Sequence, residues 1–279
     1  MYIFFIVLLA IFIIMKVVAV IKREPQNIDD ENPYLHPEIA EKILPAEMAR
    51  WVNTHLADSV SSTSDKRKHT HSREENLYER FFKPLMDNLL SFVGLLILSP
   101  VFLAITIAIK IDDPGPVFFM QKRVGKNKRF FALHKFRSMA MNTPHDTPTH
   151  MLANPEQYIT RVGRFLRRSS LDEIPQIWDI FRGKMSIIGP RPALWNQADL
   201  IACRDKWEAN SVMPGLTGLA QISGRDELEI EDKARLDGEY TQSLKNSGSV
   251  GSFLIDLKCF FGTVLPVLRS DGIVEGKGV

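Results

Sequence analysis

Two apolar stretches separated by a long polar one organise the first part of the chain. Residues 1–21 are apolar apart from Lys16, and about 20 such residues are enough to cross a bilayer as a helix. No basic segment precedes this stretch and no small-residue cleavage site follows it, so a transmembrane anchor is favoured over a signal peptide. Lys22 and Arg23 come next and favour a cytoplasmic location for the chain that follows.

The polar stretch covers residues 22–82 and contains several prolines and a run rich in serine, lysine and histidine. This composition predicts a cytoplasmic linker. Apolar residues between Pro37 and His55 recur at roughly helical spacing. They predict a short helix inside the linker.

The second apolar stretch, residues 83–111, is long enough to span a membrane, yet Ser99 and Pro100 lie near its middle. Proline removes a backbone hydrogen bond and kinks a helix, and the serine hydroxyl can satisfy the freed carbonyl. Hydropathy alone favours an ordinary kinked transmembrane helix. A re-entrant helix over residues 84–111 is preferred, because it keeps the rest of the chain on the same side of the membrane as the linker.

The remaining pattern predicts a small β-hairpin and several helices. Residues 116–124 and 128–136 are short aromatic and β-branched runs separated by a turn, which is typical of a hairpin. Residues 226–246 predict a charged helix, whereas residues 252–269 predict an amphipathic helix that lies in the membrane interface. The fold class is therefore α+β, mostly helical and membrane-anchored, with residues 83–279 as the main domain.

Charge is distributed unevenly along the chain. The formal net charge is only +2, but the stretch from Lys122 to Arg191 contains fourteen Lys or Arg and only five Asp or Glu. This imbalance indicates an anionic partner. Helix-turn-helix, zinc-finger, RRM and KH signatures are missing from the sequence, so phospholipids and nucleotide-sugar phosphates fit better than nucleic acid. Cys203 and Cys259 stand in unrelated contexts, which argues for a reducing compartment and against a structural metal.

Residues 164–192 hold the strongest candidate for chemistry, the adjacent carboxylates Asp172 and Glu173. The arginines around this pair are Arg164, Arg167, Arg168 and Arg191. Guanidinium groups can hold a phosphate beside a carboxylate and keep that carboxylate ionised. Taken alone, the pattern is more often a surface ion-pair network, and ordinary surface charge stays an open interpretation for Arg164 and Arg168.

The motifs, taken together, resemble one family. In chain order they are Lys-Pro-x-x-Asp at Lys83–Asp87, Ser99-Pro100, PGPVFFMQKRVG, KFRSM, LRRSSLDEIPQIWDIFRGKMSIIGPRP and MPGLTGLAQISGR. This set resembles the bacterial sugar transferases and, more narrowly, the monotopic phosphoglycosyl transferases that act on polyprenyl phosphate. The resemblance covers residues 81–272 and leaves residues 1–80 aside.

The resemblance implies an activity at the cytoplasmic face of the bacterial inner membrane. A sugar 1-phosphate would pass from a UDP-sugar to undecaprenyl phosphate, with release of UMP, to start a surface glycan such as capsule, exopolysaccharide or lipopolysaccharide O-antigen. Asp172 would attack the sugar-bearing phosphate and form a covalent phosphosugar intermediate, and Glu173 would bind Mg²⁺. A carboxylate nucleophile and a divalent cation suit phosphoryl transfer.

The resemblance also implies substrate-binding positions. They are Lys135, Arg167, Pro190, Arg191, Pro192, Arg225 and Asp237. Prolines on both sides of Arg191 restrict the backbone and hold the guanidinium ready for a bidentate phosphate contact. Residues 224–240 resemble members that use N-acetylated amino or dideoxy-amino sugars, although a few pocket side chains decide sugar choice.

Two other functions stay open. One is a catalytically inactive membrane adaptor for a glycan-assembly complex, against which the intact Asp172 and Glu173 pair argues. The other is a phosphotransferase that acts without a polyprenol. A homo-oligomer and downstream glycosyltransferases are further candidate partners, and the sequence does not decide between them.

Overall fold

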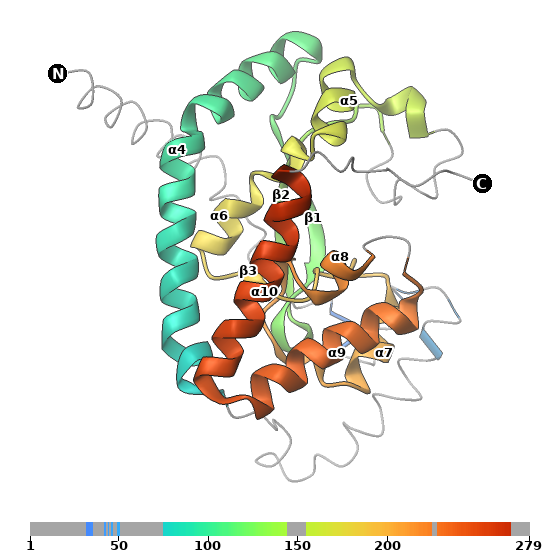
Figure 1. Ribbon diagram of the computed structural model, residues 1–279. Coiled ribbons are helices and arrows are strands. Elements are labelled where there is room, and N and C mark those ends of the chain that lie inside the picture. Colours follow the sequence, from blue (N-terminus) through green and yellow to red (C-terminus); the bar gives the residue numbers. More distant parts are fainter. Residues whose placement is uncertain are drawn as a thin grey trace, which may run out of the picture. The chain divides into compact units, whose positions relative to one another are not determined.

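The described part of the chain is mostly helical, with two small sheets (Figure 1). This agrees with the α+β, mostly helical part of the predicted fold class. The computed structural model describes residues 32–35, 42, 44, 46, 49–50, 75–143, 155–224 and 228–268. The predicted anchor at residues 1–21 and the site candidate Arg225 lie outside these residues. Of the predicted short helix between Pro37 and His55, only Lys42, Leu44, Ala46, Ala49 and Arg50 are described.

The chain folds into two compact units. The described residues of the first are 89–121, 133–143 and 155–181. Those of the second lie within 32–88, 122–132 and 182–268. Helix α4 (Lys83–Asp112) and the strands β1 (Phe118–Val124) and β2 (Phe130–Phe136) each contribute residues to both units.

The long helix α4 continues from a short π-helix, η2 (Tyr78–Phe82). Together they form a helix over residues 78–112 that is long and apolar enough to cross a membrane, and only 28% of its most apolar window is buried. Exposed apolar side chains line it, among them Leu85, Leu89, Leu90, Ile97, Ile107 and Ile111. Water is a poor solvent for such a surface, so α4 is compatible with membrane association.

Near the centre of α4, a side-chain hydrogen bond replaces the backbone hydrogen bond that Pro100 cannot make, as predicted. Pro100 has no N–H to donate to the carbonyl of Leu96, four residues earlier. The Ser99 hydroxyl donates to that carbonyl over 2.8 Å instead. Figure 1 shows the α4 ribbon changing direction along its length. Whether the helix re-enters or crosses a bilayer stays a prediction.

The core of the first unit lies along one face of α4. Leu95, Phe102, Ile105 and Ile109 recur at helical spacing and are buried. They pack with three residues from other elements, which are Phe136 of β2, Leu166 of α5 (Arg161–Arg168) and Trp178 of α6 (Gln176–Phe181). This cluster holds the elements that carry the acidic pair.

Strands β1 and β2 form the predicted hairpin. A 3₁₀ turn, Lys126–Lys128, joins them, and the N–H of Gly125 donates to the carbonyl of Arg129 over 2.7 Å. Asn127 takes the left-handed conformation that this turn requires, with φ of 55°. Strand β2 is buried at six of its seven positions, the exception being half-buried Lys135.

In the second unit, β3 (Ser186–Ile188) pairs in parallel with β4 (Gly215–Thr217). The register aligns Ser186 with Gly215 and Ile188 with Thr217. The helices of this unit are α7 (Ala198–Asp205), α8 (Leu219–Ser223), α9 (Ile230–Asn246) and α10 (Gly248–Leu268). The predicted helices at 226–246 and 252–269 correspond to α9 and α10.

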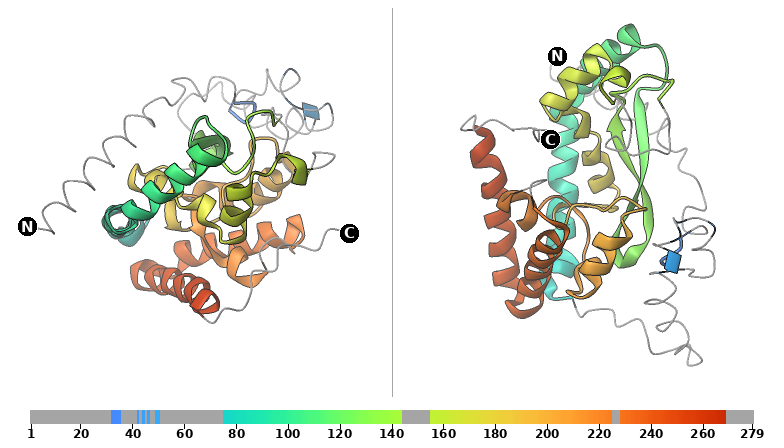
Figure 2. Two further views of the ribbon diagram at one scale, coloured as in Figure 1. Left: turned by 90° about the horizontal axis from the view of Figure 1, so that it is seen from above. Right: turned by 90° about the vertical axis from the view of Figure 1, so that its right-hand side faces the viewer.

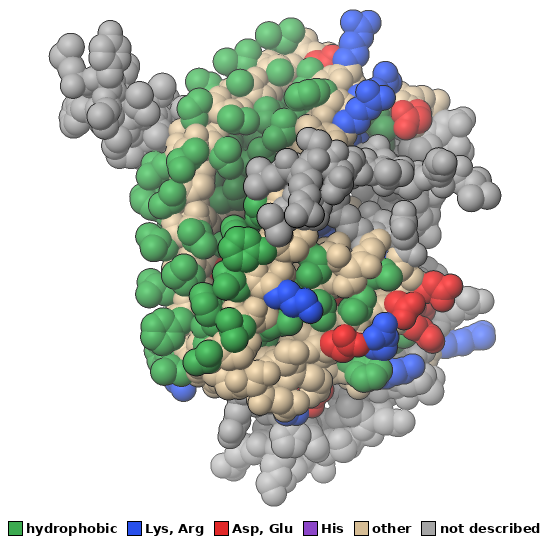
Figure 3. Space-filling model, viewed as in Figure 1, with side chains coloured by type: hydrophobic (Ala, Val, Ile, Leu, Met, Phe, Trp, Pro, Cys, Tyr) green, Lys and Arg blue, Asp and Glu red, His purple; other side chains and the backbone are tan. Residues whose placement is uncertain are grey.

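Helix α10 buries some of its polar side chains and exposes several of its apolar ones. Polar Ser252 and Asp256 are buried, whereas Phe253, Leu254 and Phe261 are exposed. Figure 3 shows apolar side chains over α4 and α10, and acidic and basic ones over α9. An apolar outer face is what an interfacial helix requires. The interfacial location of α10 itself stays a prediction.

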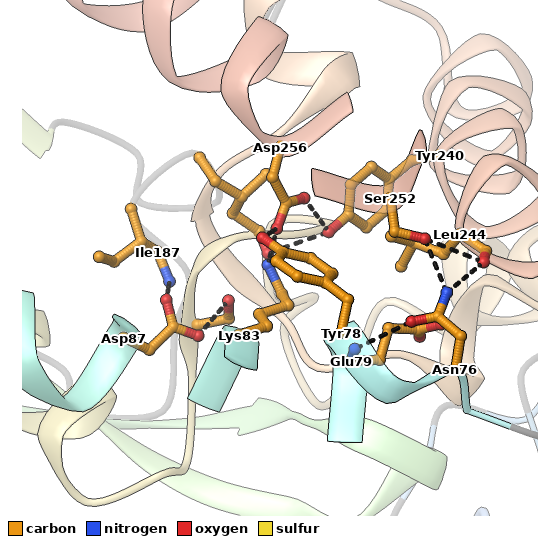
Figure 4. Close-up of polar contacts among 12 residues, drawn as sticks. Asn76, Tyr78, Glu79, Lys83, Asp87, Ile187, Tyr240, Leu244, Ser252 and Asp256 are labelled. Atoms are coloured by element: carbon orange, nitrogen blue, oxygen red, sulfur yellow. Dashed lines mark hydrogen bonds and ion pairs between the residues drawn. The ribbon is translucent and has the colours of Figure 1, made fainter. Parts of the chain in front are cut away.

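Asp256 anchors the first turns of the long helix to α10 (Figure 4). Its carboxylate accepts hydrogen bonds from the hydroxyls of Tyr78, over 2.8 Å, and Tyr240, over 2.7 Å. The ammonium of Lys83 completes the set, and both charged groups are buried. Each oxygen of the buried carboxylate therefore has a donor, as a stable buried ion pair requires.

A second carboxylate fixes α4 one turn further on. Asp87 accepts from the Ser186 hydroxyl over 2.7 Å and from the Ile187 N–H over 3.0 Å, at the start of β3. Just ahead of these anchors, the Asn76 side chain donates to the Leu244 carbonyl over 2.9 Å. These contacts account for the Lys-Pro-x-x-Asp motif, because its Lys and Asp are the two charged anchors.

Candidate active site

The acidic pair lies on a single 3₁₀ turn, Leu171–Glu173, between α5 and α6. Ser170 precedes the turn in the left-handed conformation, with φ of 54°, which is uncommon for a residue other than glycine. Leu171 and Ile174 pack on the core cluster on either side of the pair. Only 8% of Asp172 is exposed. The turn therefore holds Asp172 in place and largely out of water.

Basic residues from two other elements face this turn. The ammonium of Lys135, on β2, donates to Oε1 of Glu173 over 2.8 Å. On α5, the Arg167 Nε donates to the Ser138 hydroxyl over 3.1 Å, and its charge acts on Asp172. The structure thus brings together four predicted site residues, Lys135, Arg167, Asp172 and Glu173.

The carboxylate of Asp172 is not held by a neighbouring side chain. Among the described residues, none donates a side-chain hydrogen bond to it. Burial raises the pKa of this carboxyl, Lys135 and Arg167 lower it, and Glu173 raises it. The net direction is upward, because removal from water outweighs the attraction of the two basic side chains. A raised pKa makes the carboxylate more basic and a better nucleophile.

A buried histidine and aspartate fix the strand that carries Lys135. His134 Nδ1 lies 2.6 Å from Asp179 Oδ1, and the His134 N–H donates to Asp179 Oδ2 over 2.9 Å. Both residues are fully buried. The pair ties β2 to α6 directly beside Lys135. The sequence did hold a signal for it, since each residue is a polar one inside an otherwise apolar run, but nothing in the sequence paired the two.

In the second unit, the Gly-Pro-Arg-Pro segment is fixed by close backbone packing. The Gly189 N–H donates to the Thr217 carbonyl over 2.8 Å, and the Gly215 N–H to the Pro190 carbonyl over 2.9 Å. A Cβ at Gly215 would lie 2.1 Å from the Gly189 nitrogen, so only glycine fits there. Gly215, Leu216 and Thr217 thus form a short strand whose backbone lies very close to Gly189.

Arg204, which the sequence analysis did not single out, supports this segment. Its Nη2 donates to the Arg191 carbonyl over 2.9 Å and to Asp237 Oδ2 over 2.6 Å. Asp237 is only 1% exposed, and burial raises its pKa while Arg204 lowers it. A buried carboxylate that is already paired is poorly placed to bind a substrate. We therefore interpret Asp237 as a residue that holds Arg204 against Arg191. Pro190 and Pro192 are buried on either side of half-buried Arg191.

Residues 78–270 match the family model described as bacterial sugar transferase. The chain belongs to the bacterial sugar transferase family. The match begins at Tyr78, the first residue of η2, and it contains all the described site residues.

Three relatives show how this sugar transferase compares with known proteins. The UDP-glucose:undecaprenyl-phosphate glucose-1-phosphate transferase of Xanthomonas campestris pv. campestris is 44% identical over 144 residues, which are 51% of this chain and 30% of that protein. The exopolysaccharide production protein ExoY of Sinorhizobium fredii is 35% identical, over 68% of this chain and 87% of its own length. The UDP-N-acetylgalactosamine-undecaprenyl-phosphate N-acetylgalactosaminephosphotransferase of Aeromonas hydrophila is 32% identical, over 69% of this chain and 45% of that protein. The chain thus spans less than half of the first and third relatives.

Among the described residues, the acidic pair is the candidate centre for a metal ion. No group of three or more His, Cys, Asp or Glu that could hold a metal occurs among the described residues. Magnesium usually takes only one or two carboxylates together with substrate phosphates. The adjacent carboxylates of Asp172 and Glu173 match that donor set. Lys135 pairs with Glu173 here, so an ion would share or replace this contact.

Proposed function

We propose that this sugar transferase moves a sugar 1-phosphate from a UDP-sugar to undecaprenyl phosphate. The observation that carries the proposal is the Asp172 carboxylate beside Lys135 and Arg167. This carboxylate is buried, its pKa is raised, and no side chain in the described part of the chain donates a hydrogen bond to it. The names of the Xanthomonas and Aeromonas relatives give undecaprenyl phosphate as their acceptor and a UDP-sugar as donor.

The reaction takes two displacements in this proposal. An oxygen of Asp172 attacks the sugar-bearing phosphorus, the bond from that phosphorus to the bridging oxygen breaks, and UMP leaves with the electron pair. The resulting acyl phosphate is attacked at phosphorus by a phosphate oxygen of the lipid. The carboxylate is released, and the polyprenyl-diphosphate sugar forms. Splitting the transfer this way lets one site handle a soluble donor and a lipid acceptor in turn.

The neighbouring side chains have separate roles. Lys135 and Arg167 compensate the negative charge that gathers on the phosphate oxygens. Glu173 would hold Mg²⁺, which when bound neutralises charge on the diphosphate. Arg191, held by Arg204 and by its flanking prolines, is proposed to bind the phosphates of the donor. The proposed roles of Pro190 and Pro192 are to fix that backbone, and Arg225 remains a proposed donor contact.

The proposed location is the cytoplasmic face of the bacterial inner membrane. The apolar surface of α4 supports a membrane location, because lipid covers such a surface better than water does. A re-entrant α4 would keep the site on the side from which UDP-sugars arrive. The sugar is proposed to be an N-acetylated amino sugar, whereas relatives carry names with glucose, galactose and N-acetylgalactosamine.

UMP release tests the proposal. The full chain, reconstituted with undecaprenyl phosphate and Mg²⁺, is incubated with UDP-glucose, UDP-galactose and their N-acetylated amino counterparts. We expect UMP and a lipid-linked sugar diphosphate with at least one donor, and no turnover when the lipid is left out. UMP release from none of the donors would favour an inactive adaptor. Equal turnover with a soluble phosphate acceptor would favour a polyprenol-independent enzyme.

A further inference from the structure

Five successive backbone carbonyls, starting at Arg191, each accept a hydrogen bond. We name residues 191–195 the Arg191 segment. The part of the chain that matches the family holds its first four carbonyls, through Arg204 at Arg191, Arg123 at Pro192, the Val124 N–H at Ala193 and the Gln197 N–H at Leu194. The fifth carbonyl, that of Trp195, accepts from the hydroxyl of Tyr34 over 2.9 Å. The last fixed point of the segment therefore comes from a residue 161 positions away in the sequence.

Tyr34 belongs to a stretch that lies ahead of the family match. The match begins at Tyr78, whereas the described residues of this stretch are 32–35, 42, 44, 46, 49 and 50. We name these residues the strap. Tyr34, Leu44 and Ala49 are buried in one hydrophobic cluster that also contains Ala193, and Trp195 packs against this cluster. The strap is thus part of the core of the second unit, on the side of the Arg191 segment.

Asn32 fixes the strap to the turn of the hairpin. Its Nδ2 donates to the Lys128 carbonyl over 2.9 Å, and its Oδ1 accepts from the Tyr34 N–H over 3.0 Å. The second contact, two residues along the chain, is an Asx turn, and Asn32 is fully buried. Figure 2 shows the strap, in blue, beside the hairpin. These contacts determine the direction in which the Tyr34 side chain points.

Ring packing places the Tyr34 hydroxyl against the segment. The Tyr34 ring meets Phe130 edge-on, with centroids 6.1 Å apart. The Lys122 ammonium lies 5.5 Å from the ring centroids of both Phe130 and Trp195, within the range of a cation–π contact. Burial raises the pKa of the Tyr34 phenol, and the charge of Asp199 raises it further, so the hydroxyl keeps its proton and can donate.

Covering the core alone would not require this hydroxyl. A phenylalanine at position 34 would fill the same space and pack on Phe130 equally well. The hydroxyl instead adds a hydrogen bond to the Trp195 carbonyl, four residues after Arg191. Pro192 restricts the backbone between the two, so a shift at Trp195 is transmitted toward Arg191.

We infer that the strap positions the Arg191 segment for the UDP-sugar, with Tyr34 as the positioning residue. The inference rests on the proposed function, in which Arg191 binds the phosphates of the donor. Binding of the UDP-sugar then depends on residues that the family match does not include, whereas the chemistry at Asp172 does not.

Binding of UDP to the full chain tests the inference. Tyr34→Phe removes the hydroxyl and keeps the ring. We expect its Kd for UDP, measured by calorimetry in detergent with Mg²⁺, to rise about fivefold, the factor that one hydrogen bond represents. KM for the UDP-sugar should rise by a similar factor, with kcat unchanged. Tyr78→Phe is the matched control, because its hydroxyl donates to Asp256; it should lower the unfolding temperature and leave the Kd for UDP unchanged. Equal Kd values for wild type and Tyr34→Phe would overturn the inference.

Amide hydrogen exchange tests the strap contact without any ligand. The Leu194 and Gln197 N–H groups are hydrogen-bonded within and just after the segment. In Tyr34→Phe, peptides that cover residues 193–198 should exchange faster than in wild type, whereas the paired strands β3 and β4 should exchange as before. Unchanged exchange at 193–198 would also overturn the inference. A wild type that shows this exchange difference from Tyr34→Phe but binds no UDP would refute the proposed function and, with it, the role of the strap in donor binding.

Discussion

Two buried aspartates, Asp172 and Asp256, show opposite ways of keeping a carboxylate out of water. They are similarly exposed, at 8% and 5%. Asp256 accepts from two tyrosine hydroxyls and a lysine ammonium, so both of its oxygens are occupied. Asp172 has positive charge nearby but, among the described residues, no side-chain donor on its oxygens. The first arrangement stabilises a fold, and the second leaves an oxygen available for attack.

The difference follows from the cost of desolvation. The hydrogen bonds and charge pairing of a fully hydrogen-bonded buried ion offset the hydration energy that the ion loses. Removing one partner leaves the other buried without a hydrogen bond, which is costly. A buried carboxylate without such donors is destabilised, and its raised pKa expresses this. Proteins tolerate such a group mainly where function uses it. Substitutions at the two positions should therefore affect different properties of the molecule.

Asp172→Asn should have the largest effect, a loss of activity without a loss of stability. We expect turnover to fall by at least about 10³-fold, because an amide is a poor nucleophile toward phosphorus. Intact-protein mass spectrometry of the wild type with UDP-sugar should show a phosphosugar adduct that the variant lacks. An adduct of equal yield on the variant would remove Asp172 from the nucleophile role.

The same variant has a predicted stability profile. Because burial raises the pKa of Asp172, the folded state holds its proton more tightly than the unfolded state does. Stability from this group is then present at low pH and is lost as pH rises through the folded pKa. Asn carries no charge and avoids that loss. The variant should unfold at the same or a higher temperature than wild type at neutral pH, and the difference should shrink in acid. A clear loss of stability at neutral pH would contradict this.

Asp256→Asn should have the largest effect on stability. It removes the hydrogen-bonded carboxylate from the buried Lys83 ammonium, and breaking such a buried pair typically costs about 3–5 kcal/mol. Thermal unfolding in detergent measures it. Asp232→Asn is the control, because Asp232 is an exposed residue of α9 whose pairing with Arg235 is long, at 3.4 Å. It should change stability by less than about 0.5 kcal/mol. Similar unfolding temperatures for the two variants would refute the anchoring role of Asp256.

Structural features that depend on residues close together in the sequence could be predicted from local sequence patterns. The hairpin, the Ser99 hydroxyl on the carbonyl that Pro100 leaves free, and the helices α9 and α10 each follow from short stretches of sequence. Among the site residues, Asp172, Glu173, Lys135 and Arg167 were named from motifs and do meet in the structure.

Pairings between distant residues were not predictable in the same way. His134 and Asp179 are 45 residues apart, and Lys83 and Asp256 are 173 apart. A sequence shows that such residues are polar within apolar runs, but it does not show which one meets which. The same limit explains Asp237: its motif placed it near the site, whereas its burial and its pairing with Arg204 come only from the packing of α7 against α9. The balance between burial and charge at Asp172 is likewise a property of the packed state.

Asp237→Asn should have a smaller effect than Asp256→Asn. It weakens the contact to Arg204, which keeps a second partner in the Arg191 carbonyl, so we expect a loss of about 2 kcal/mol. Activity should fall through a higher KM for the UDP-sugar, because Arg191 is less firmly held. Arg191→Lys is the comparison, and it should raise KM without lowering the unfolding temperature. A fall in kcat alone for Asp237→Asn would instead indicate direct participation in the chemistry.

Lys135→Gln should lower turnover less than Asp172→Asn does, because only one of the charges around the phosphate is lost, and it should also shift the pH dependence. This shift is the smallest of the predicted effects, and it separates charge from structure at Asp172. Lys135 lowers the pKa of Asp172, so its removal should raise that pKa further and move the acid limb of kcat/KM to higher pH. Lys135→Arg keeps the charge and should leave the limb in place. The opposite sign applies to Glu173, whose charge raises the pKa of Asp172, so Glu173→Gln should move the limb to lower pH in whatever activity remains. Limbs that shift in the same direction in both glutamine variants would mean that the acid limb does not report Asp172. The contrast between Asp256 and Asp172 would then have to be explained by something other than the charges around Asp172.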